Sequence, residues 1–152
     1  MNMQLTQKES DLLKDLKSQE SLCVEKYTKH AAAAADAQLK NLFSQLAQEE
    51  QRHLDTITQM EGGTVPQAAG SSSGQTAFTA TYGTAPNEQK QSDAYLCSDV
   101  LATEKHASHL YDVSIFEFKD ASARSALNHI QKEEQGHGKR IYDYMQTNGM
   151  YS

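Results

Sequence analysis

The stretch QEEQRHLDTI, residues 48–57, has a close counterpart in KEEQGHGKRI, residues 132–141. Each contains two consecutive glutamates, a histidine three residues after the second glutamate, and an isoleucine four residues after the histidine. Side chains three or four positions apart lie on the same face of a helix. Both stretches therefore predict a helix that presents a glutamate, a histidine and an isoleucine on one face.

The repeat extends well beyond these ten residues. Sliding the sequence by 84 residues also superimposes the following pairs without a gap: Asp15 on Asp99, Glu20 on Glu104, Tyr27 on Tyr111 and Asp36 on Asp120. The matches fall at predicted helix caps and at acidic positions. The chain is therefore interpreted as two helical hairpins of common design.

Capping signals divide each half into two helices. Thr6 and Glu9 have the spacing of a capping box, and Asp36 and Asp120 are predicted N-caps. The third helix is expected to begin between Asn87 and Ser92. The four predicted helices run from Thr6 to about Ala35, from Asp36 to Glu61, from this start to about Lys119, and from Asp120 to about Asn148.

A stretch rich in Gly, Ser and Thr separates the two halves. It reads as a spacer with Phe78 and Tyr82 as anchor points, and it is long enough to cross the full length of a helix pair. We therefore expect an all-α fold: a single domain over residues 1–152, with a hairpin at 4–61, a crossover at 62–88 and a second hairpin at 89–148. Such an order is typical of a four-helix bundle with one long crossover.

Each predicted helix carries one glutamate within its apolar stripe, and two helices add a histidine three residues further on. The glutamates are Glu20, Glu50, Glu104 and Glu134, and the histidines are His53 and His137. By the same spacing, Glu49 is expected to face water together with Gln45. No Lys or Arg is expected on the stripes near these positions.

Four buried carboxylates without a positive partner would cost several kcal/mol each, by order of magnitude. Two divalent cations would balance their charge, and neutral imidazoles would complete the coordination, as in bundle-core carboxylate proteins. Oxygen and imidazole ligands favour iron or manganese over zinc. The alternative is a metal-free bundle whose protonated carboxyl groups are hydrogen-bonded to the histidines.

The composition excludes several classes of protein. A net charge of -6 without a basic cluster argues against nucleic-acid binding. No apolar run approaches the roughly 18 residues that a membrane span needs. The N-terminus lacks the apolar core of a secretory signal, so the protein is expected to be made in the cytoplasm. Cys23 and Cys97 are interpreted as core thiols, and His106, His109 and His129 as surface residues.

The chain resembles the spore coat F-type proteins of spore-forming bacteria, which belong to the ferritin-like superfamily. The resemblance rests on the runs LTQKESDLLKDLKSQESLCVEKY, AQEEQRHLDTI, SDAYLCSDVLATEKH, YDVSIFEFKD and LNHIQKEEQGHGKRIYDYM. It implies a ferritin-like four-helix bundle in the spore coat, with other coat proteins as partners. Independently of the resemblance, the linked pair of hairpins could also close as a homodimer, for which the sequence specifies no interface.

The likeness to ferritin-like di-metal proteins is by motif, and it implies roles for individual residues. Glu50 and Glu134 would bridge two metal ions, Glu20 and Glu104 would be terminal ligands, and His53 and His137 would complete the set. Tyr27 and Tyr111 resemble tyrosines that hydrogen-bond ligand carboxylates, with core packing as the alternative. The resemblance fixes no reaction; our hypothesis is that a di-nuclear iron or manganese site reacts with dioxygen or peroxide, as a peroxide scavenger or a ferroxidase. The alternative function is a structural coat protein without catalytic activity.

Overall fold

The computed structural model describes residues 3–67 and 77–151. It contains α1 (Gln7–Ala33), α2 (Ala37–Glu61), α3 (Glu88–Ile115) and α4 (Ala121–Thr147), and no strand occurs among the described residues. The prediction of an all-α four-helix bundle is confirmed.

Side-chain caps fix where the helices begin. At Thr6 both halves of the capping box are formed: the Thr6 hydroxyl accepts from the amide of Glu9, and the Glu9 carboxylate accepts from the amide of Thr6. The carboxylates of Asp36 and Asp120 and the amide oxygen of Asn87 cap α2, α4 and α3 in the same way. Each cap satisfies an amide that the helix itself leaves without a partner.

Helix α3 ends at Ile115, earlier than the predicted end near Lys119. A turn follows, in which the amide of Glu117 donates to the carbonyl of Ser114. Phe118 is buried within this turn, and the amide of Lys119 donates to the carboxylate of Glu9 on α1. The prediction of a longer helix was wrong because an apolar residue at helical spacing can also be buried by a turn.

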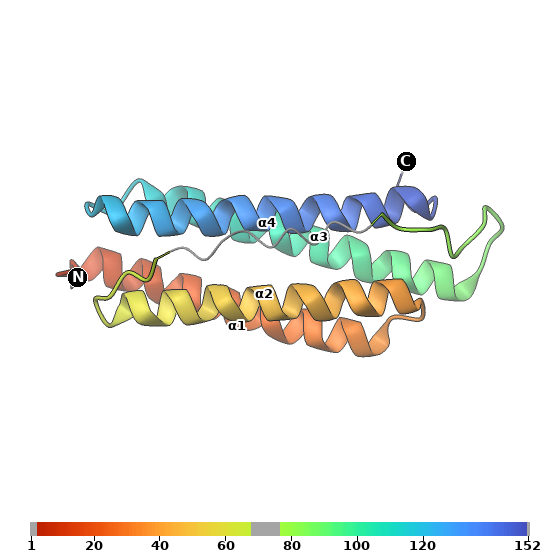
Figure 1. Cartoon of the computed structure of the whole chain (residues 1–152), viewed down its shortest axis with the longest axis horizontal. Coiled ribbons are helices and arrows are strands. Elements are labelled where there is room, and N and C mark those ends of the chain that lie inside the picture. The colour runs from red at the N-terminus through yellow and green to blue at the C-terminus, as the bar shows by residue number, and fades with distance from the viewer. Residues whose placement is uncertain (1–2, 68–76, 152) are drawn as a thin grey trace.

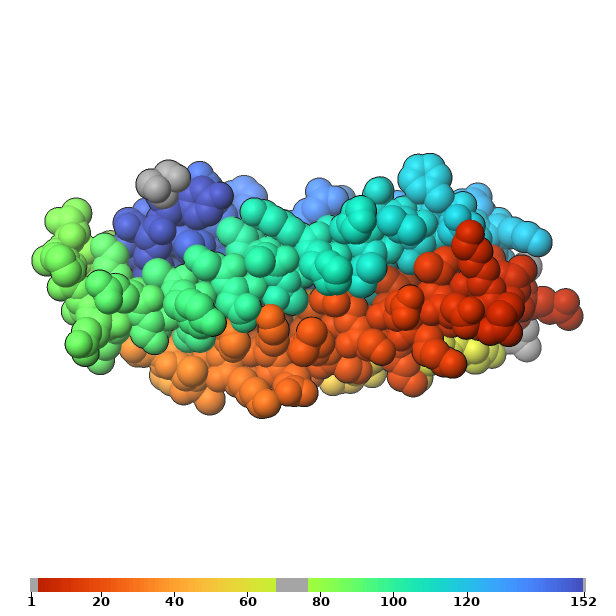
Figure 2. Space-filling model, turned by 180° about the vertical axis from the view of Figure 1, so that it is seen from behind, coloured from red at the N-terminus to blue at the C-terminus, as the bar shows by residue number. Residues whose placement is uncertain are grey.

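The two hairpins lie side by side along the length of the bundle (Figure 1). Helix α1 packs on α2 and α3 packs on α4, while α1 also contacts α3 and α2 contacts α4. Viewed from behind, α1 and α3 lie against each other along the molecule (Figure 2). Helix α2 ends at the opposite end of the bundle from the start of α3, as a bundle with one long crossover requires.

The second half of the crossover is fastened to the end of the bundle. The Phe78 ring packs edge-on against Tyr144 with their centroids 5.3 Å apart, and the Tyr82 hydroxyl donates to Asp93 at 2.7 Å. Both contacts agree with the roles expected for Phe78 and Tyr82. Asp93 also accepts the amides of Ala35 and Asp36 and so holds the turn between α1 and α2. Residues 68–76 of the expected crossover lie outside the described residues.

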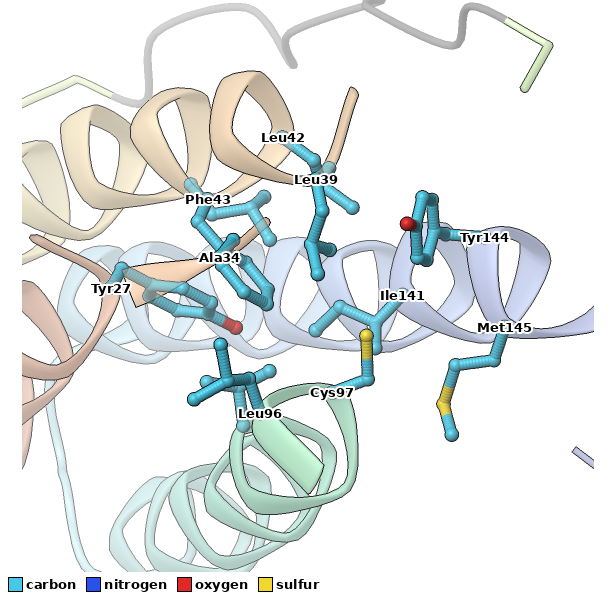
Figure 3. Packing of buried hydrophobic residues seen from close by; sticks show 12 residues of the cluster. Tyr27, Ala34, Leu39, Leu42, Phe43, Leu96, Cys97, Ile141, Tyr144 and Met145 are labelled. Atoms are coloured by element: carbon cyan, nitrogen blue, oxygen red, sulfur yellow. The ribbon is translucent and has the colours of Figure 1, made fainter. Parts of the chain in front are cut away.

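The core consists of two apolar clusters at different levels along the bundle axis. One contains Tyr27, Phe43, Cys97, Ile141 and Tyr144 with their neighbours (Figure 3), and the other is built around Leu13, Leu16, Ile57, Tyr111 and Leu127. Burying a large apolar side chain contributes roughly 1.5–3 kcal/mol. The glutamates and histidines of the four helix stripes belong to neither cluster and lie at sequence positions between them.

Candidate metal centre

The fold gathers six side chains from all four helices into one buried layer. Helix α1 supplies Glu20, α2 supplies Glu50 and His53, α3 supplies Glu104, and α4 supplies Glu134 and His137. These six side chains are the candidate metal ligands and are called the inner ligands below; none of them is more than 3% exposed. The structure therefore brings together all the residues at which the sequence predicts metal ligands.

The inner ligands form two overlapping groups of four. One consists of Glu20, Glu50, His53 and Glu134, and the other of Glu50, Glu104, Glu134 and His137. Within each group the ligand atoms all lie within 4.8 Å of one another, close enough to hold one metal ion. Glu50 and Glu134, called the shared glutamates below, belong to both groups. They are the two positions for which the resemblance implies bridging ligands.

The two histidines turn the same ring nitrogen towards the layer. Nδ1 of His53 lies 2.7 Å from Glu50 and 3.2 Å from Glu134, and Nδ1 of His137 lies 3.1 Å from Glu104. The rings stack with their centroids 5.7 Å apart. Nδ1 is therefore the nitrogen that each histidine can offer to a metal ion, while Nε2 points outward.

Each Nε2 meets a carboxylate of the other hairpin. Nε2 of His53 lies 2.7 Å from Glu133 on α4, and Nε2 of His137 lies 3.0 Å from Glu49 on α2. Glu49 and Glu133 are called the outer carboxylates below. A carboxylate on the far nitrogen of a metal-binding histidine fixes the tautomer and the ring orientation. This arrangement leaves Nδ1 free of its proton when the ring is neutral.

The prediction that Glu49 faces water was wrong, because its side chain is buried against α4. A helix in a bundle has two neighbouring helices, so its buried face is wider than one apolar stripe. No Lys or Arg was expected on the apolar stripes, but this expectation missed a buried cation beside them: Arg140 is buried and donates to Glu49 at 3.0 Å. The second glutamate in both copies of the repeat was the sequence signal for a buried outer carboxylate, since each histidine needs a partner for Nε2.

The two tyrosines also reach across from one hairpin to the other. The Tyr27 hydroxyl on α1 donates to Glu104 on α3 at 2.5 Å, and the Tyr111 hydroxyl on α3 donates to Glu20 on α1. Burial, followed by the nearby carboxylates, raises the pKa of both phenols well above the usual value, so they keep their protons and act as donors. Both rings are also packed in the apolar clusters, so the hydrogen-bonding and packing roles coexist.

Burial changes the proton affinity of the glutamates. It raises the pKa of Glu20 to about 8 and that of Glu104 to about 7, with the charge of Glu134 adding to both. It also raises the pKa of Glu50, together with the charges of Glu20 and Glu104. Burial acts on Glu134 in the same direction, but the close imidazoles of His137 and His53 outweigh it and lower the pKa of that carboxyl.

The histidines respond in the opposite sense to burial. Burial alone would lower the pKa of His53 and His137, but the surrounding carboxylates outweigh it and raise both pKa values well above the usual one. Without a metal cation, protons on the imidazoles and on some of the carboxyl groups therefore neutralise the layer. Divalent cations would replace these protons.

Several buried oxygens of the layer have no hydrogen-bond partner. They are Oε1 of Glu20 and Glu104, Oε2 of Glu50, and both oxygens of Glu134. Oε1 of Glu134 lies near both Nδ1 atoms, but not in the direction of a hydrogen bond. A buried carboxylate oxygen without a partner is costly, and buried polar atoms are nearly always paired. Oxygen-preferring cations fit these unsatisfied atoms.

The other histidines and the cysteines considered in the sequence do not belong to the buried layer of glutamates and histidines. His106 and His109 are exposed, as expected from the sequence. Cys23 and Cys97 are buried free thiols. Burial raises the pKa of Cys97 to about 12 and raises that of Cys23 well above its usual value, with the nearby glutamates adding to the effect at Cys23. Both cysteines therefore remain protonated, in agreement with their interpretation as core thiols.

These features define a class: a four-helix bundle with a buried layer of carboxylates and histidines that could hold metal ions. Residues 92–152 match the family model of the Coat F domain, and they cover most of α3 and all of α4. This segment is therefore similar to the Coat F domain, and the resemblance to spore coat F-type proteins is confirmed over it. The match indicates a relation to spore coat proteins.

The other comparisons add no relative. A search of curated proteins found no significant match, and a search of solved structures found none either. The ferritin-like superfamily therefore stays a prediction. The matched segment contains Glu104, Glu134 and His137 but not the candidate ligands of α1 and α2. Within the described residues, no helix is both long and apolar enough to cross a bilayer.

Proposed function

We propose that this coat protein holds two iron or manganese ions in its bundle core and uses them to react with peroxide or dioxygen. The observation that carries the proposal is the set of five buried carboxylate oxygens without hydrogen-bond partners. They come from the four glutamates of two ligand groups that share Glu50 and Glu134. Two cations would satisfy these oxygens together.

Charge supports two ions rather than one. The four inner glutamates carry four negative charges when ionised, and two divalent cations would balance them. One cation would leave two negative charges buried in an apolar core, where an uncompensated charge costs several kcal/mol, by order of magnitude. The protons that now neutralise the layer would leave as the metal ions bind.

The donor atoms favour iron or manganese. Each group offers three carboxylates and one imidazole, and neither contains a thiolate. Structural zinc sites are usually built from cysteine and histidine, whereas this mixture of oxygen and nitrogen suits iron and manganese. A pair of such ions supplies Lewis acidity and electrons for the reduction of small oxidants.

The protein itself would position the metal ions and exclude large molecules from them. The shared glutamates lie between the two groups and would keep the ions adjacent. The tyrosine hydroxyls hold one oxygen of each terminal glutamate, which leaves the other oxygen of Glu20 and Glu104 for a metal ion. Because the inner ligands are almost fully buried, only small molecules such as peroxide or dioxygen can be substrates.

The test compares the wild type with a Glu50→Ala, Glu134→Ala double variant after anaerobic loading with Fe(II) or Mn(II). We expect two metals per chain and peroxide consumption in the wild type, and loss of both in the double variant. A Glu25→Ala, Glu117→Ala variant is the matched control, since these glutamates form exposed ion pairs with Lys29 and Lys8. Binding clearly below two metals per wild-type chain would refute the proposal.

The alternative function is a metal-free structural coat protein. One observation favours it: histidine–glutamate and tyrosine–glutamate hydrogen bonds link all four helices through the layer. In that case the wild type would bind no metal, and the double variant would be as stable as the wild type or more stable. Thermal unfolding of both metal-free proteins measures this.

A further inference from the structure

The two halves of the centre have the same inner ligands but different surroundings. The shift of 84 residues that relates the hairpins places Glu49 on Glu133, so the outer carboxylates correspond to each other. Their neighbours do not correspond. The shift places Gln45 on His129 and Thr56 on Arg140, so the two outer carboxylates have different partners.

The outer carboxylate of His137 is held at both oxygens. One oxygen of Glu49 lies 3.0 Å from Nε2 of His137, and the other accepts from Arg140 at 3.0 Å. The second Nη of Arg140 donates to Gln45 at 2.5 Å, which fixes the guanidinium in turn. The side chains of Glu49 and Arg140 are only 9% and 10% exposed. The ring of His137 is thus held by a rigid, buried clamp.

The outer carboxylate of His53, Glu133, has a short contact at only one of its two oxygens. Oε1 of Glu133 lies 2.7 Å from Nε2 of His53, while Oε2 faces Nε2 of His129 at 3.5 Å, too far for a strong hydrogen bond. His129 is 26% exposed and Glu133 is 13% exposed. Thr56, which stands in the place of Arg140, donates to the carbonyl of Arg52 instead. The ring of His53 is therefore oriented by a carboxylate that has only one short contact and is slightly more exposed than Glu49.

We propose that the two metal positions are not equivalent and that Arg140 is the positioning residue that makes them differ. The position with Glu104 and His137 binds its ion firmly, and the position with Glu20 and His53 exchanges its ion with solution. This inference rests on the proposed function, since it concerns the same two ions.

Geometry, rather than charge, decides which position is firmer. Arg140 cancels most of the negative charge that Glu49 would add, so the clamp contributes a fixed orientation of His137. Glu133 keeps its charge, but solvent screens it in part, and its second oxygen has no short contact, so the His53 ring is less constrained. Changing an outer partner of a metal-binding histidine typically alters metal affinity by about 10- to 100-fold. A difference of about tenfold between the positions is therefore expected.

Two variants isolate the positions. Glu20→Ala removes a ligand of the exchanging position and Glu104→Ala removes the corresponding ligand of the firm one, so each protein keeps one intact group. Titration with Mn(II), followed by the electron paramagnetic resonance signal of the free ion, gives each affinity. We expect Glu20→Ala to bind about tenfold more tightly than Glu104→Ala.

The role of Arg140 is tested in both backgrounds. Adding Arg140→Gln should weaken Mn(II) binding about tenfold in the Glu20→Ala protein and change it little in the Glu104→Ala protein. Arg52→Gln is the matched control, because it removes the same charge from an exposed position on α2. Should Arg140→Gln fail to fold, Gln45→Ala removes the second partner of the guanidinium and should weaken the same position several-fold.

Three results would overturn the inference: equal affinities at the two positions, tighter binding by Glu104→Ala, or an equal loss in both backgrounds when Arg140 is replaced. The last would mark Arg140 as merely structural. A wild type that binds two ions with equal affinity and consumes peroxide would leave the proposed function standing and refute only this inference. A wild type that binds no ion would refute both.

Discussion

Replacing Gly136 with alanine is expected to stabilise the protein by about 1 kcal/mol, the usual difference in helix propensity between the two residues. Gly136 lies inside α4, beside His137. A Cβ built there would meet nothing within 4 Å, so no neighbour has to move. Gly138, on the other side of His137, would place its Cβ 3.6 Å from the Leu101 side chain, an ordinary contact. Both substitutions should therefore be stabilising.

Urea and thermal unfolding of the metal-free protein provide the assay. For a chain of this length, 1 kcal/mol corresponds to about 2–4 °C in the melting temperature. Gly149→Ala is the contrasting variant, because Gly149 has a φ of +66° and alanine there is strained. It should destabilise the protein by about 1 kcal/mol. A destabilising effect of Gly136→Ala would refute the reasoning and would mean that α4 does not keep its helical geometry at this position.

Three further predictions concern other parts of the bundle. Burial favours the neutral form of Glu9, but hydrogen bonds from the amides of Thr6 and Lys119 outweigh it and lower the pKa of this carboxyl. The ionised Glu9 carboxylate therefore stabilises the fold above its ordinary pKa, and this stabilisation is lost as the pH falls through the lowered pKa. Glu9→Gln should reduce the free energy of unfolding in urea by about 1 kcal/mol at pH 7 and should not change it near pH 2. Tyr27→Phe removes the donor to Glu104 and should weaken Mn(II) binding about tenfold in a titration; unchanged binding would assign the tyrosine to packing alone. Cys97 is fully buried and protonated, so it should react with a thiol reagent only in denaturant, and rapid labelling of the native protein would contradict this.

The inner ligands could be predicted from the sequence because they follow a simple rule. A glutamate such as Glu50 that falls in an apolar row at helical spacing must face the core of a bundle. The internal repeat then supplied a second observation of the same pattern at Glu134. The helix starts were equally accessible, since side-chain caps such as Thr6 and Asp120 are local signals.

Contacts between helices could not be predicted from such local rules. Glu49 lies one residue from the stripe, and only the approach of α4 decides that it is buried and not exposed. Arg140 was missed for the same reason, because its partners Glu49 and Gln45 are on another helix. Likewise, the spacing of Tyr27 and Glu20 suggests a relation within one helix, whereas Tyr27 donates to Glu104 across the bundle.

The most direct test of the central claim is a crystal structure of the protein loaded with manganese or iron, with anomalous diffraction recorded at the metal's absorption edge. We expect two anomalous peaks about 3.5–4 Å apart, the usual separation in two-metal sites. Each should lie beside Nδ1 of one histidine, and both should contact Glu50 and Glu134. A single peak, a peak outside this layer, or no peak in fully loaded protein would contradict the two-metal account.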